Sequence, residues 1–359
     1  MESTSTTGTG VMLIALCASY INSATRLKHF FVMLTSWITQ NNIQCSLIIS
    51  TSIVDEGLLR EFEIMIKEFK QTHAEILDTV DFRILISRKQ MPQFKHYKNI
   101  MDHYPDLVDT NPWILFTDDD DIWHPNRTWI YHTAIEHIIS TRRLDIEHIY
   151  CPYYVQSTEA DKKDYATAAD IDMAIKNGDI QQSKCDTNYV HSCVRLERLY
   201  YFLTQSTDEL LTCMYADVKF SFFMQSDGSE KGQQSLTITA PWDDGWMYFY
   251  RHVSDPNGSI TNKKGRLPDG ILYSPELNGM LKSLPIIIQT QLVTILSSIE
   301  LLICTGKSDL VELKRENERI QLDHGVPARF IKEVIRPLYT FVDEFLNHSY
   351  YVNLMKKIV

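Results

Sequence analysis

The sequence predicts an α/β protein whose mostly parallel sheet is flanked by helices, with a separate helical region toward the C-terminal end. Short apolar runs alternate with longer segments in which apolar residues recur at helical spacing, and this alternation is typical of a parallel sheet. From residue 274 onward the spacing is helical, with a break near 325–327. The hydrophobic content of 44% and the charged content of 23% fit a folded chain.

Four continuous apolar runs predict buried strands in the first third of the chain, and a helix is expected after each. The strands are expected at 11–16, 45–49, 82–86 and 113–116. The helices are expected at 27–38, 58–77, 98–101 and 128–140. Strands separated by helices favour parallel pairing, because parallel neighbours need a long crossover connection.

The middle of the chain is less regular. We expect strands at 149–155, 189–194, 236–240 and 247–252, a polar surface segment at 161–178 and a helix at 208–225. Residues 255–270 are rich in Gly, Pro, Asn and Lys and predict a linker. The expected parts are a disordered N-terminus at 1–10, an α/β domain at 11–265 and a helical region at 270–359.

Charge and cysteine content narrow the classes of function. Lys and Arg number 35 and Asp and Glu number 46, and the resulting net charge of −11 disfavours a general nucleic-acid binder. The seven cysteines are odd in number, and no two of them form a C-x-x-C pair. We therefore expect a reducing compartment and no disulfide framework.

Two apolar stretches resemble targeting or membrane segments at first sight. The run at 11–18 follows ten residues that include Glu2 and no basic residue, which favours a strand over a signal peptide. The run at 285–304 contains two glutamines and Glu300, which favours a packed helix over a membrane span. The sequence predicts no integral membrane segment and a cytoplasmic location.

The strongest local feature is the acidic tetrad, a run of four Asp residues at 118–121, directly after the predicted strand at 113–116. Adjacent carboxylates repel one another, and a bound Mg²⁺ or Mn²⁺ ion is the simplest reason to hold them together. Ligands of open α/β sheets bind beyond the carboxyl ends of the strands. In an extended segment, Asp118 and Asp120 would point to the same side. The alternative is a solvated acidic turn that caps the next helix.

Residues 115–123, LFTDDDDIW, resemble the D-x-D segment of family-2-type glycosyltransferases with the GT-A fold. Three further segments resemble motifs of that family and follow in its order. Residues 11–22 resemble its first strand and "TYN"-like turn, 216–221 its "E-D" helix start, and 248–252 its "Y-R-x-H" strand. The resemblance covers about 11–260 and implies a GT-A-like, Rossmann-type sheet.

This resemblance implies a metal-dependent, inverting enzyme that moves a sugar from a nucleoside diphosphate sugar, with a UDP-sugar expected, to a hydroxyl of a glycan or other acceptor. Mn²⁺ or Mg²⁺ would act as a Lewis acid on the leaving diphosphate. The resemblance makes Asp120 the direct metal ligand, places Asp118 near the ribose or the metal, and places His252 at the metal or the diphosphate. Asp119 and Asp121 would support donor binding. Spacing does not decide which carboxylate touches the ion.

The acceptor hydroxyl must lose a proton as the new bond forms, so a carboxylate base is needed. The resemblance gives this role to Asp217, although Ala216 stands where the family often has Glu. In a purely structural role, Asp217 would be an acid in the first turn of a helix. The alternative base is Asp244.

Asp244 belongs to the segment PWDDGW at 241–246. Aromatic rings stack on the apolar faces of sugars, and carboxylates accept hydrogen bonds from sugar hydroxyls. The two aromatics that flank the acids therefore suggest an acceptor-side role for Trp242, Asp243 and Asp244. A plain turn, which Asp-Gly favours, is the other interpretation.

The nucleotide is expected beyond the first three strands and at the closing strand. By resemblance, the candidates are Ala18, Ser19, Tyr20, Ser52, Asp55, Lys95 and Arg251. Ala18, Ser19 and Tyr20 follow strand one. After strand two, either Ser52 or Asp55 would bind the nucleotide base. Lys95 and Arg251 would offset phosphate charge, unless they are ordinary solvated or ion-paired surface residues.

Two rival functions remain open at this stage. A catalytically inactive carbohydrate-binding or scaffold relative is supported by Ala216. A metal-dependent phosphohydrolase or nucleotidyltransferase could use the same acidic run, but the sequence lacks a Gly-rich phosphate loop and a second metal-binding cluster. The lack of a secretory signal is typical of bacterial or large-DNA-virus glycosyltransferases, the latter acting in the host cytoplasm.

Overall fold

The computed structural model describes residues 11–41, 45–156, 164–180, 182–184, 189–206, 208, 211, 216–225, 234–239 and 246–251. The chain divides into two compact units. The first unit comprises Met1–Leu203 and Asp227–His252, and the second comprises Thr204–Ser226 and Val253–Val359. The predicted N-terminus at 1–10, the linker at 255–270 and the helical region at 270–359 lie outside the described residues.

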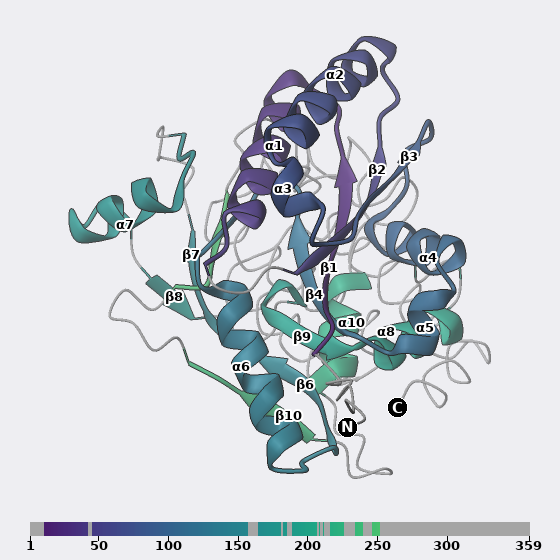
Figure 1. Ribbon diagram of the computed structural model, residues 1–359, viewed down its shortest axis with the longest axis vertical. Helices are drawn as coiled ribbons and strands as arrows, with labels where there is room; N and C mark the ends of the chain where they lie inside the picture. The colour runs from purple at the N-terminus through teal and green to yellow at the C-terminus, as the bar shows by residue number, and fades with distance from the viewer. Residues whose placement is uncertain are drawn as a thin grey trace, which may run out of the picture. The chain divides into compact units, whose positions relative to one another are not determined.

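The first unit is built on a seven-stranded mixed sheet (Figure 1). Its strands are β1 (Leu13–Tyr20), β2 (Ser46–Ser52), β3 (Phe82–Ser87), β4 (Trp113–Asp118), β6 (Ile146–Tyr150), β9 (Ser192–Arg195) and β10 (Gln234–Thr237). Their order is β10-β6-β9-β4-β1-β2-β3. Only β9 runs antiparallel to its neighbours, β4 and β6, and the other adjacent pairs are parallel. The predicted α/β class with a mostly parallel sheet is confirmed.

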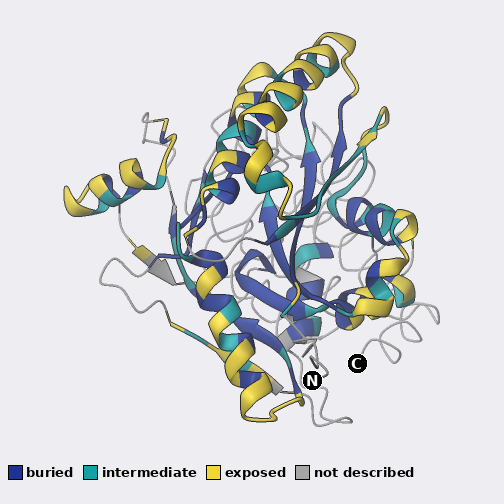
Figure 2. Ribbon diagram, in the orientation of Figure 1, coloured by how far each residue is buried: buried dark blue, intermediate teal, exposed yellow. Residues whose placement is uncertain are grey.

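The three central strands β1, β2 and β4 are buried along nearly their whole length, as their continuous apolar runs predict (Figure 2). Their register aligns their carboxyl ends, because Ala18 of β1 lies opposite Ser50 of β2 and Asp118 of β4. The residues that follow these strands therefore gather at one edge of the sheet. The acidic tetrad begins at that edge.

Helices connect the strands and cover the sheet. They are α1 (Ala24–Ile38), α2 (Glu56–Thr72), α3 (Ala74–Leu77), α4 (Gln93–His103), α5 (Asp106–Thr110), α6 (Arg127–Ser140) and α8 (Leu196–Gln205). The side chain of Ser23 accepts a hydrogen bond from the backbone N–H of Arg26, which starts α1 immediately after β1. Helix α4 packs on β1 and β2, and α6 packs on β6. The helix predicted at 58–77 is divided at His73 into α2 and α3.

A second, four-stranded sheet has the order β5-β11-β7-β8. Its strands are β5 (Ile122–Trp123), β11 (Tyr248–Tyr250), β7 (Tyr153–Gln156) and β8 (Gln182–Lys184). The single strand predicted at 149–155 is wrong: the structure breaks it at Cys151 and Pro152 into β6 and β7, which belong to different sheets. Proline explains the break, because it has no N–H to donate to a strand ladder.

Two further local expectations need correction. The segment 161–178 is more than a polar surface stretch, because it contains α7 (Ala168–Lys176), which starts with a capping box between Thr167 and Asp170. Its buried residues Ile171 and Ala174 join a core cluster with Trp246. The strand predicted at 189–194 is in fact a 3₁₀ turn, η1 (Tyr189–His191), followed by β9.

In the second unit the structure describes helix α10 (Ala216–Gln225), which is the C-terminal part of the helix predicted at 208–225. Cys17, Cys45, Cys151 and Cys193 are buried free thiols, in agreement with the expected lack of disulfides for these four. Within the described part of the chain, no helix is both long enough and apolar enough to cross a bilayer. The apolar run at 285–304 lies outside that part.

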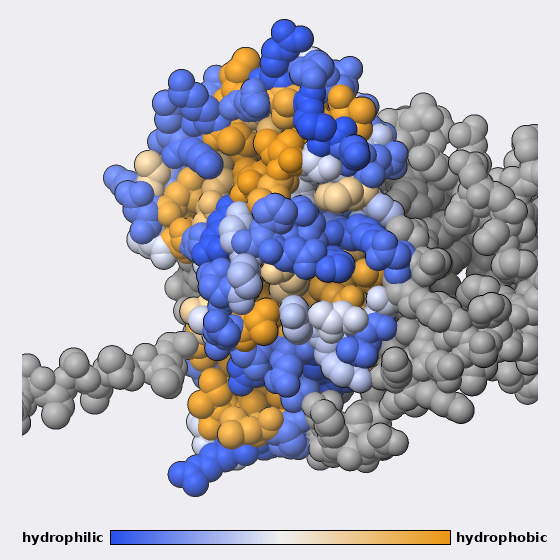
Figure 3. All heavy atoms as spheres, turned by 90° about the vertical axis from the view of Figure 1, so that its right-hand side faces the viewer, coloured by the Kyte–Doolittle hydropathy of each residue, from blue (hydrophilic) through white to orange (hydrophobic). Residues whose placement is uncertain are grey.

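The exposed surface of the first unit mixes polar and apolar side chains. On the face that lies at the right of Figure 1, apolar groups are interspersed with hydrophilic ones (Figure 3). Edge strand β3 is only half-buried and exposes Ile86, whereas the central strands are inaccessible.

Candidate functional site

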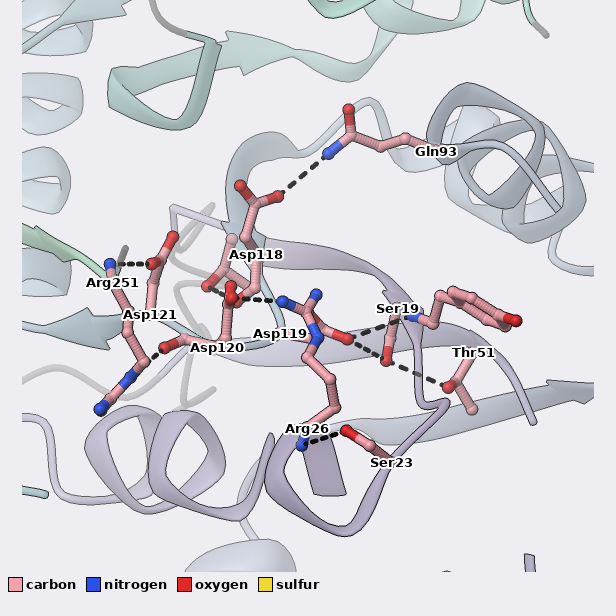
Figure 4. A network of polar contacts seen from close by, with 12 residues as sticks. Ser19, Ser23, Arg26, Thr51, Gln93, Asp118, Asp119, Asp120, Asp121 and Arg251 are labelled. Carbon is pink, nitrogen blue, oxygen red and sulfur yellow. Dashed lines mark hydrogen bonds and ion pairs between the residues drawn. The ribbon is translucent and has the colours of Figure 1, made fainter. Parts of the chain in front are cut away.

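The acidic tetrad occupies a turn at the carboxyl end of β4. Strand β4 ends at Asp118, the next two residues form a turn, and β5 begins after Asp121. The segment is not extended, so the alternation expected to place Asp118 and Asp120 on one side does not apply. Instead the carboxylates diverge, and protein donors surround each of them (Figure 4).

Asp119 points toward the end of β1. Its Oδ2 atom accepts hydrogen bonds from the Ser19 hydroxyl at 2.7 Å and from the backbone N–H of Tyr20 at 3.1 Å. The Thr51 hydroxyl of β2 donates to the Ser19 oxygen at 3.1 Å. This chain of contacts connects the ends of three adjacent parallel strands, and it brings Ser19 and Tyr20, the last two residues of β1, to the tetrad.

Arg26, in the first turn of α1, bridges two members of the tetrad. One terminal nitrogen forms an ion pair with Asp119 Oδ1, and the other forms an ion pair with Asp120 Oδ2 (Figure 4). The guanidinium is largely buried, with 13% of its side chain exposed. Burial alone would lower the pKa of Arg26, but the carboxylates of Asp119 and Asp120 raise it above its ordinary value.

Asp118 points the opposite way, toward α4 and η1. Its Oδ1 atom accepts hydrogen bonds from Gln93 Nε2 at 3.0 Å and from the Tyr189 hydroxyl. Its backbone N–H donates to the Tyr248 hydroxyl of β11 at 2.8 Å. Burial raises the pKa of Asp118, and the neighbouring carboxylates raise it further, whereas the bond from Tyr189 lowers it.

Asp121 faces β11 and the residue that follows it. Its Oδ1 atom accepts the backbone N–H of Arg251 at 2.8 Å. Tyr248 lies close enough to lower the pKa of this carboxyl, yet Oδ2 has no described partner with hydrogen-bond geometry. Burial is the largest influence and raises the pKa of Asp121 well above its usual range.

Arg251 is anchored within the protein at every guanidinium nitrogen. Its Nε donates to the carbonyl oxygen of Asp120 at 2.9 Å, one terminal nitrogen pairs with Asp164 at 2.6 Å, and the other donates to the carbonyl of Tyr165. The residue is buried. Its contacts support a positioning role at the tetrad, and its pairing with a phosphate stays a prediction.

A divalent ion would find carboxylate oxygens of the right chemistry here. Oδ2 of Asp118 and Oδ1 of Asp120 accept no hydrogen bond from any described residue, and Mn²⁺ and Mg²⁺ prefer such oxygens. Across the described ranges, no three His, Cys, Asp or Glu side chains converge on one point. Asp118 and Asp120 therefore each offer an oxygen whose chemistry fits a divalent ion, and further ligands would have to come from elsewhere, such as a diphosphate.

The other expected nucleotide-binding residues lie farther along the same edge. Ser52 is buried, and its hydroxyl donates to the carbonyl of Lys89 at 2.9 Å and accepts the N–H of Met91 at 3.1 Å. Asp55 is exposed and caps α2 by accepting the N–H of Leu58 at 2.8 Å. These contacts give both side chains structural roles, and their nucleotide contacts stay predictions.

The positions of the remaining candidates are as follows. Ala18, at the end of β1, is buried beside Asp118, and Lys95 is half-buried in the first turn of α4. Asp217 is the second residue of α10. That helix belongs to the second unit.

The acceptor-side segment is described only at its end. Trp242, Asp243, Asp244 and the metal candidate His252 lie outside the described residues. Trp246 is fully buried, and its indole N–H donates to Asp172 of α7 at 2.8 Å. Trp246 is therefore not a sugar-stacking side chain, and that expectation stays a prediction for Trp242.

Four residues of the site were missed by sequence reasoning: Arg26, Gln93, Tyr189 and Asp164. A topological signal exists for the first of them. Because β1 and β4 are parallel neighbours, the first turn of the helix after β1 must lie beside the residues after β4. No comparable signal marks Gln93 or Tyr189, since their contact with Asp118 depends on the exact packing of α4 and η1.

No protein-family model matches the sequence, and neither does any curated protein. Among solved structures, one similar chain is residues 1–349 of S. aureus TarS in complex with UDP-GlcNAc. The identity is 11% and the TM-score is 0.41, over 96% of this chain and 91% of that one. Another is the mannosyltransferase PcManGT from Pyrobaculum calidifontis in complex with GDP-Man and Mn²⁺. Here the identity is 9% and the TM-score 0.40, over 98% and 74% of the chains.

Proposed function

We propose that the chain is a glycosyltransferase that moves a sugar from a nucleoside diphosphate sugar to an acceptor hydroxyl. One observation carries the proposal: segments far apart in the sequence, each resembling a motif of the same enzyme family, contact one another. The last two residues of β1 bind Asp119, and the β11 segment binds the backbone of Asp118 and the side chain of Asp121. Unrelated chance resemblances would not be expected to share one site.

The position of the site supports a ligand with negative charge and a ribose. It lies at the carboxyl ends of β1 and β4, where open α/β sheets bind nucleotides. Asp118 and Asp120 would hold Mn²⁺ or Mg²⁺, which stabilises the charge that develops on the leaving diphosphate. Within the chain, Ser19, Tyr20 and Arg26 fix the turn that presents these carboxylates.

For the transfer step we propose Asp217 as the base that takes the proton of the acceptor hydroxyl. Attack from the face opposite the diphosphate would invert the anomeric centre. A carboxylate in the first turn of α10 fits a base carried by an element separate from the tetrad. The expected donor is a UDP-sugar, and Asp244 remains the alternative base.

The first test is donor binding. The wild-type chain is titrated with UDP in the presence and absence of Mn²⁺, and binding is followed by calorimetry and by the rise in melting temperature. Asp120→Asn should lose Mn²⁺-dependent binding and lower donor turnover by about 100-fold or more, the scale of one lost electrostatic contact in a transition state. Asp102→Asn is the matched control, since Asp102 is exposed on α4 and pairs with Lys98.

The products separate this proposal from its rivals. A glycosyltransferase yields a nucleoside diphosphate and a glycoside, whose anomeric configuration NMR reports. A phosphohydrolase or nucleotidyltransferase would cleave the diphosphate itself, and an inactive relative would bind without turnover. Failure of UDP, GDP and their sugars to bind with Mn²⁺ present would overturn the proposal.

A further inference from the structure

The ion pairs of the tetrad are concentrated on one side chain. Within the described ranges, Arg26 is the one cation in an ion pair with any tetrad carboxylate, and it pairs with both Asp119 and Asp120. A second buried arginine, Arg251, pairs its guanidinium with Asp164 and donates from Nε to the carbonyl of Asp120, and its backbone N–H donates to Asp121. Arg26 therefore supplies the positive charge that the sequence argument assigned to a metal ion.

A divalent ion that binds the tetrad would lie close to the charge of Arg26. Its guanidinium takes one oxygen of Asp120, the carboxylate that the proposed function makes a metal ligand. A divalent ion on the same carboxylate would lie within a few ångströms of a fixed cation, and like charges at that distance repel. The two cations thus compete for Asp120, while Asp119 remains available to hold Arg26.

We propose that Arg26 is a resident cation that holds Asp120 and keeps its affinity for a divalent ion low until an anionic ligand enters. A diphosphate offers the guanidinium another partner with bidentate geometry, so Arg26 would couple metal binding to donor binding. The coupling rests on the proposed function, whereas the competition between Arg26 and the ion does not.

The test of the competition uses Mn²⁺ alone. Free Mn²⁺ is followed by electron paramagnetic resonance during titration of the full chain. In Arg26→Gln, Mn²⁺ should bind about 10-fold more tightly than in the wild type, within the usual range of coupling between two sites. The neutral amide can still donate a hydrogen bond to Asp119 or Asp120, so the change isolates the charge.

Two further variants keep the test decisive. Arg83→Gln is the matched control, because this guanidinium pairs with Asp81 and Asp106 at the surface. It should leave Mn²⁺ affinity unchanged. Arg26→Lys keeps the charge but loses the bidentate geometry, and it should give an intermediate affinity. If Arg26→Gln does not fold, its recovery by Mn²⁺ in a thermal-shift assay and the Arg26→Lys titration still report the competition.

The second arm adds UDP. In the wild type, UDP should tighten Mn²⁺ binding more than it does in Arg26→Gln, where there is no guanidinium to relocate. Equal Mn²⁺ affinities in the wild type, Arg26→Gln and Arg26→Lys would overturn the inference. Failure of UDP to bind in any variant would instead overturn the proposed function, while the result with Mn²⁺ alone would stand.

Discussion

Two polar clusters lie beside the parallel strands of the main sheet, and their buried polar groups are stabilised by different interactions. The His96 cluster consists of His96 with Ser50, Ser52 and Asn99. Its ring nitrogens hydrogen-bond to the two hydroxyls at 2.8 and 3.2 Å, and the amide of Asn99 donates to Ser50 at 3.1 Å. The tetrad cluster, which consists of residues 118–121 and Arg26, is charged. The cation of its two ion pairs, Arg26, comes from helix α1.

Burial acts in opposite directions on the two clusters. It lowers the pKa of His96 to about 4, which keeps the ring neutral, and it raises the pKa of Asp118 above its ordinary value. A neutral cluster whose hydrogen bonds are satisfied stabilises the fold without needing a ligand. A buried cluster of carboxylates destabilises the empty protein, so it is expected where a cation or a substrate binds.

The largest effect on stability is expected from His96→Ala. The change removes a buried ring and leaves the Ser50 and Ser52 hydroxyls short of a partner, so the free energy of unfolding should fall by about 3 to 4 kcal/mol. Urea denaturation measures it, with His103→Ala, an exposed residue of the same helix, as the control. Binding of UDP and Mn²⁺ by the folded fraction should be retained. Loss of that binding would show that the His96 cluster belongs to the functional site.

The free energy of unfolding should depend on pH, because His96 has different pKa values in the folded and unfolded chains. The pKa of His96 is about 4 in the folded chain and about 6.5 in an unfolded one, so between these values the unfolded chain binds more protons. His96 alone should therefore lower the free energy of unfolding by about 3 kcal/mol as pH falls from about 6.5 to 4, for a difference of about 2.5 pH units. Denaturation at pH 7 and pH 4.5 tests this.

The control for that measurement is His96→Asn, which cannot titrate in this range. Buried His148 and His191 have lowered pKa values as well, and they contribute equally to both proteins. The wild type should lose more stability than the variant on acidification. Parallel losses in the two proteins would assign the acid sensitivity to other groups.

The smallest effect is expected from Ser19→Ala at the tetrad cluster. The change removes one donor to Asp119 but leaves the Tyr20 N–H and Arg26, so stability should fall by about 1 to 2 kcal/mol. Affinity for UDP and Mn²⁺ should weaken less than in Asp120→Asn. Ser140→Ala, at an exposed hydroxyl that bonds within its own helix, is the control. A change as large as that of Asp120→Asn would mean that Ser19 contacts the ligand directly.

Much of the fold could be predicted from the sequence, because its central strands are continuous apolar runs. Those runs placed β1, β2 and β4 correctly, and the position of the acids after β4 located the candidate site. The prediction was wrong for the segment 149–155, which contributes one strand to each of the two sheets. Pro152 separates β6 from β7. The break could have been predicted from the sequence, because proline has no N–H to donate to a strand ladder.

The partners within the site were harder to predict, because they depend on contacts between segments distant in sequence. Arg26 and Asp119 are separated by 93 positions, and Tyr189 and Asp118 by 71. Periodicity reports which face of an element is buried, but not which polar side chain meets another across an interface. Like-charge repulsion within the tetrad does call for a cation, and the chain itself provides one in Arg26.

The contacts of β11 with the tetrad also bear on the order in which the protein is made and folds. Arg251 donates its backbone N–H to Asp121, 130 positions earlier, and Tyr248 accepts the N–H of Asp118 across the same separation. A ribosome would have synthesised the parallel strands β1, β2, β3 and β4 well before Tyr248 and Arg251 emerge. Contacts of such long range form late, since closing a long loop costs entropy before any contact compensates. The sheet can therefore assemble first, and the acidic site would become competent only after the chain has extended past residue 251.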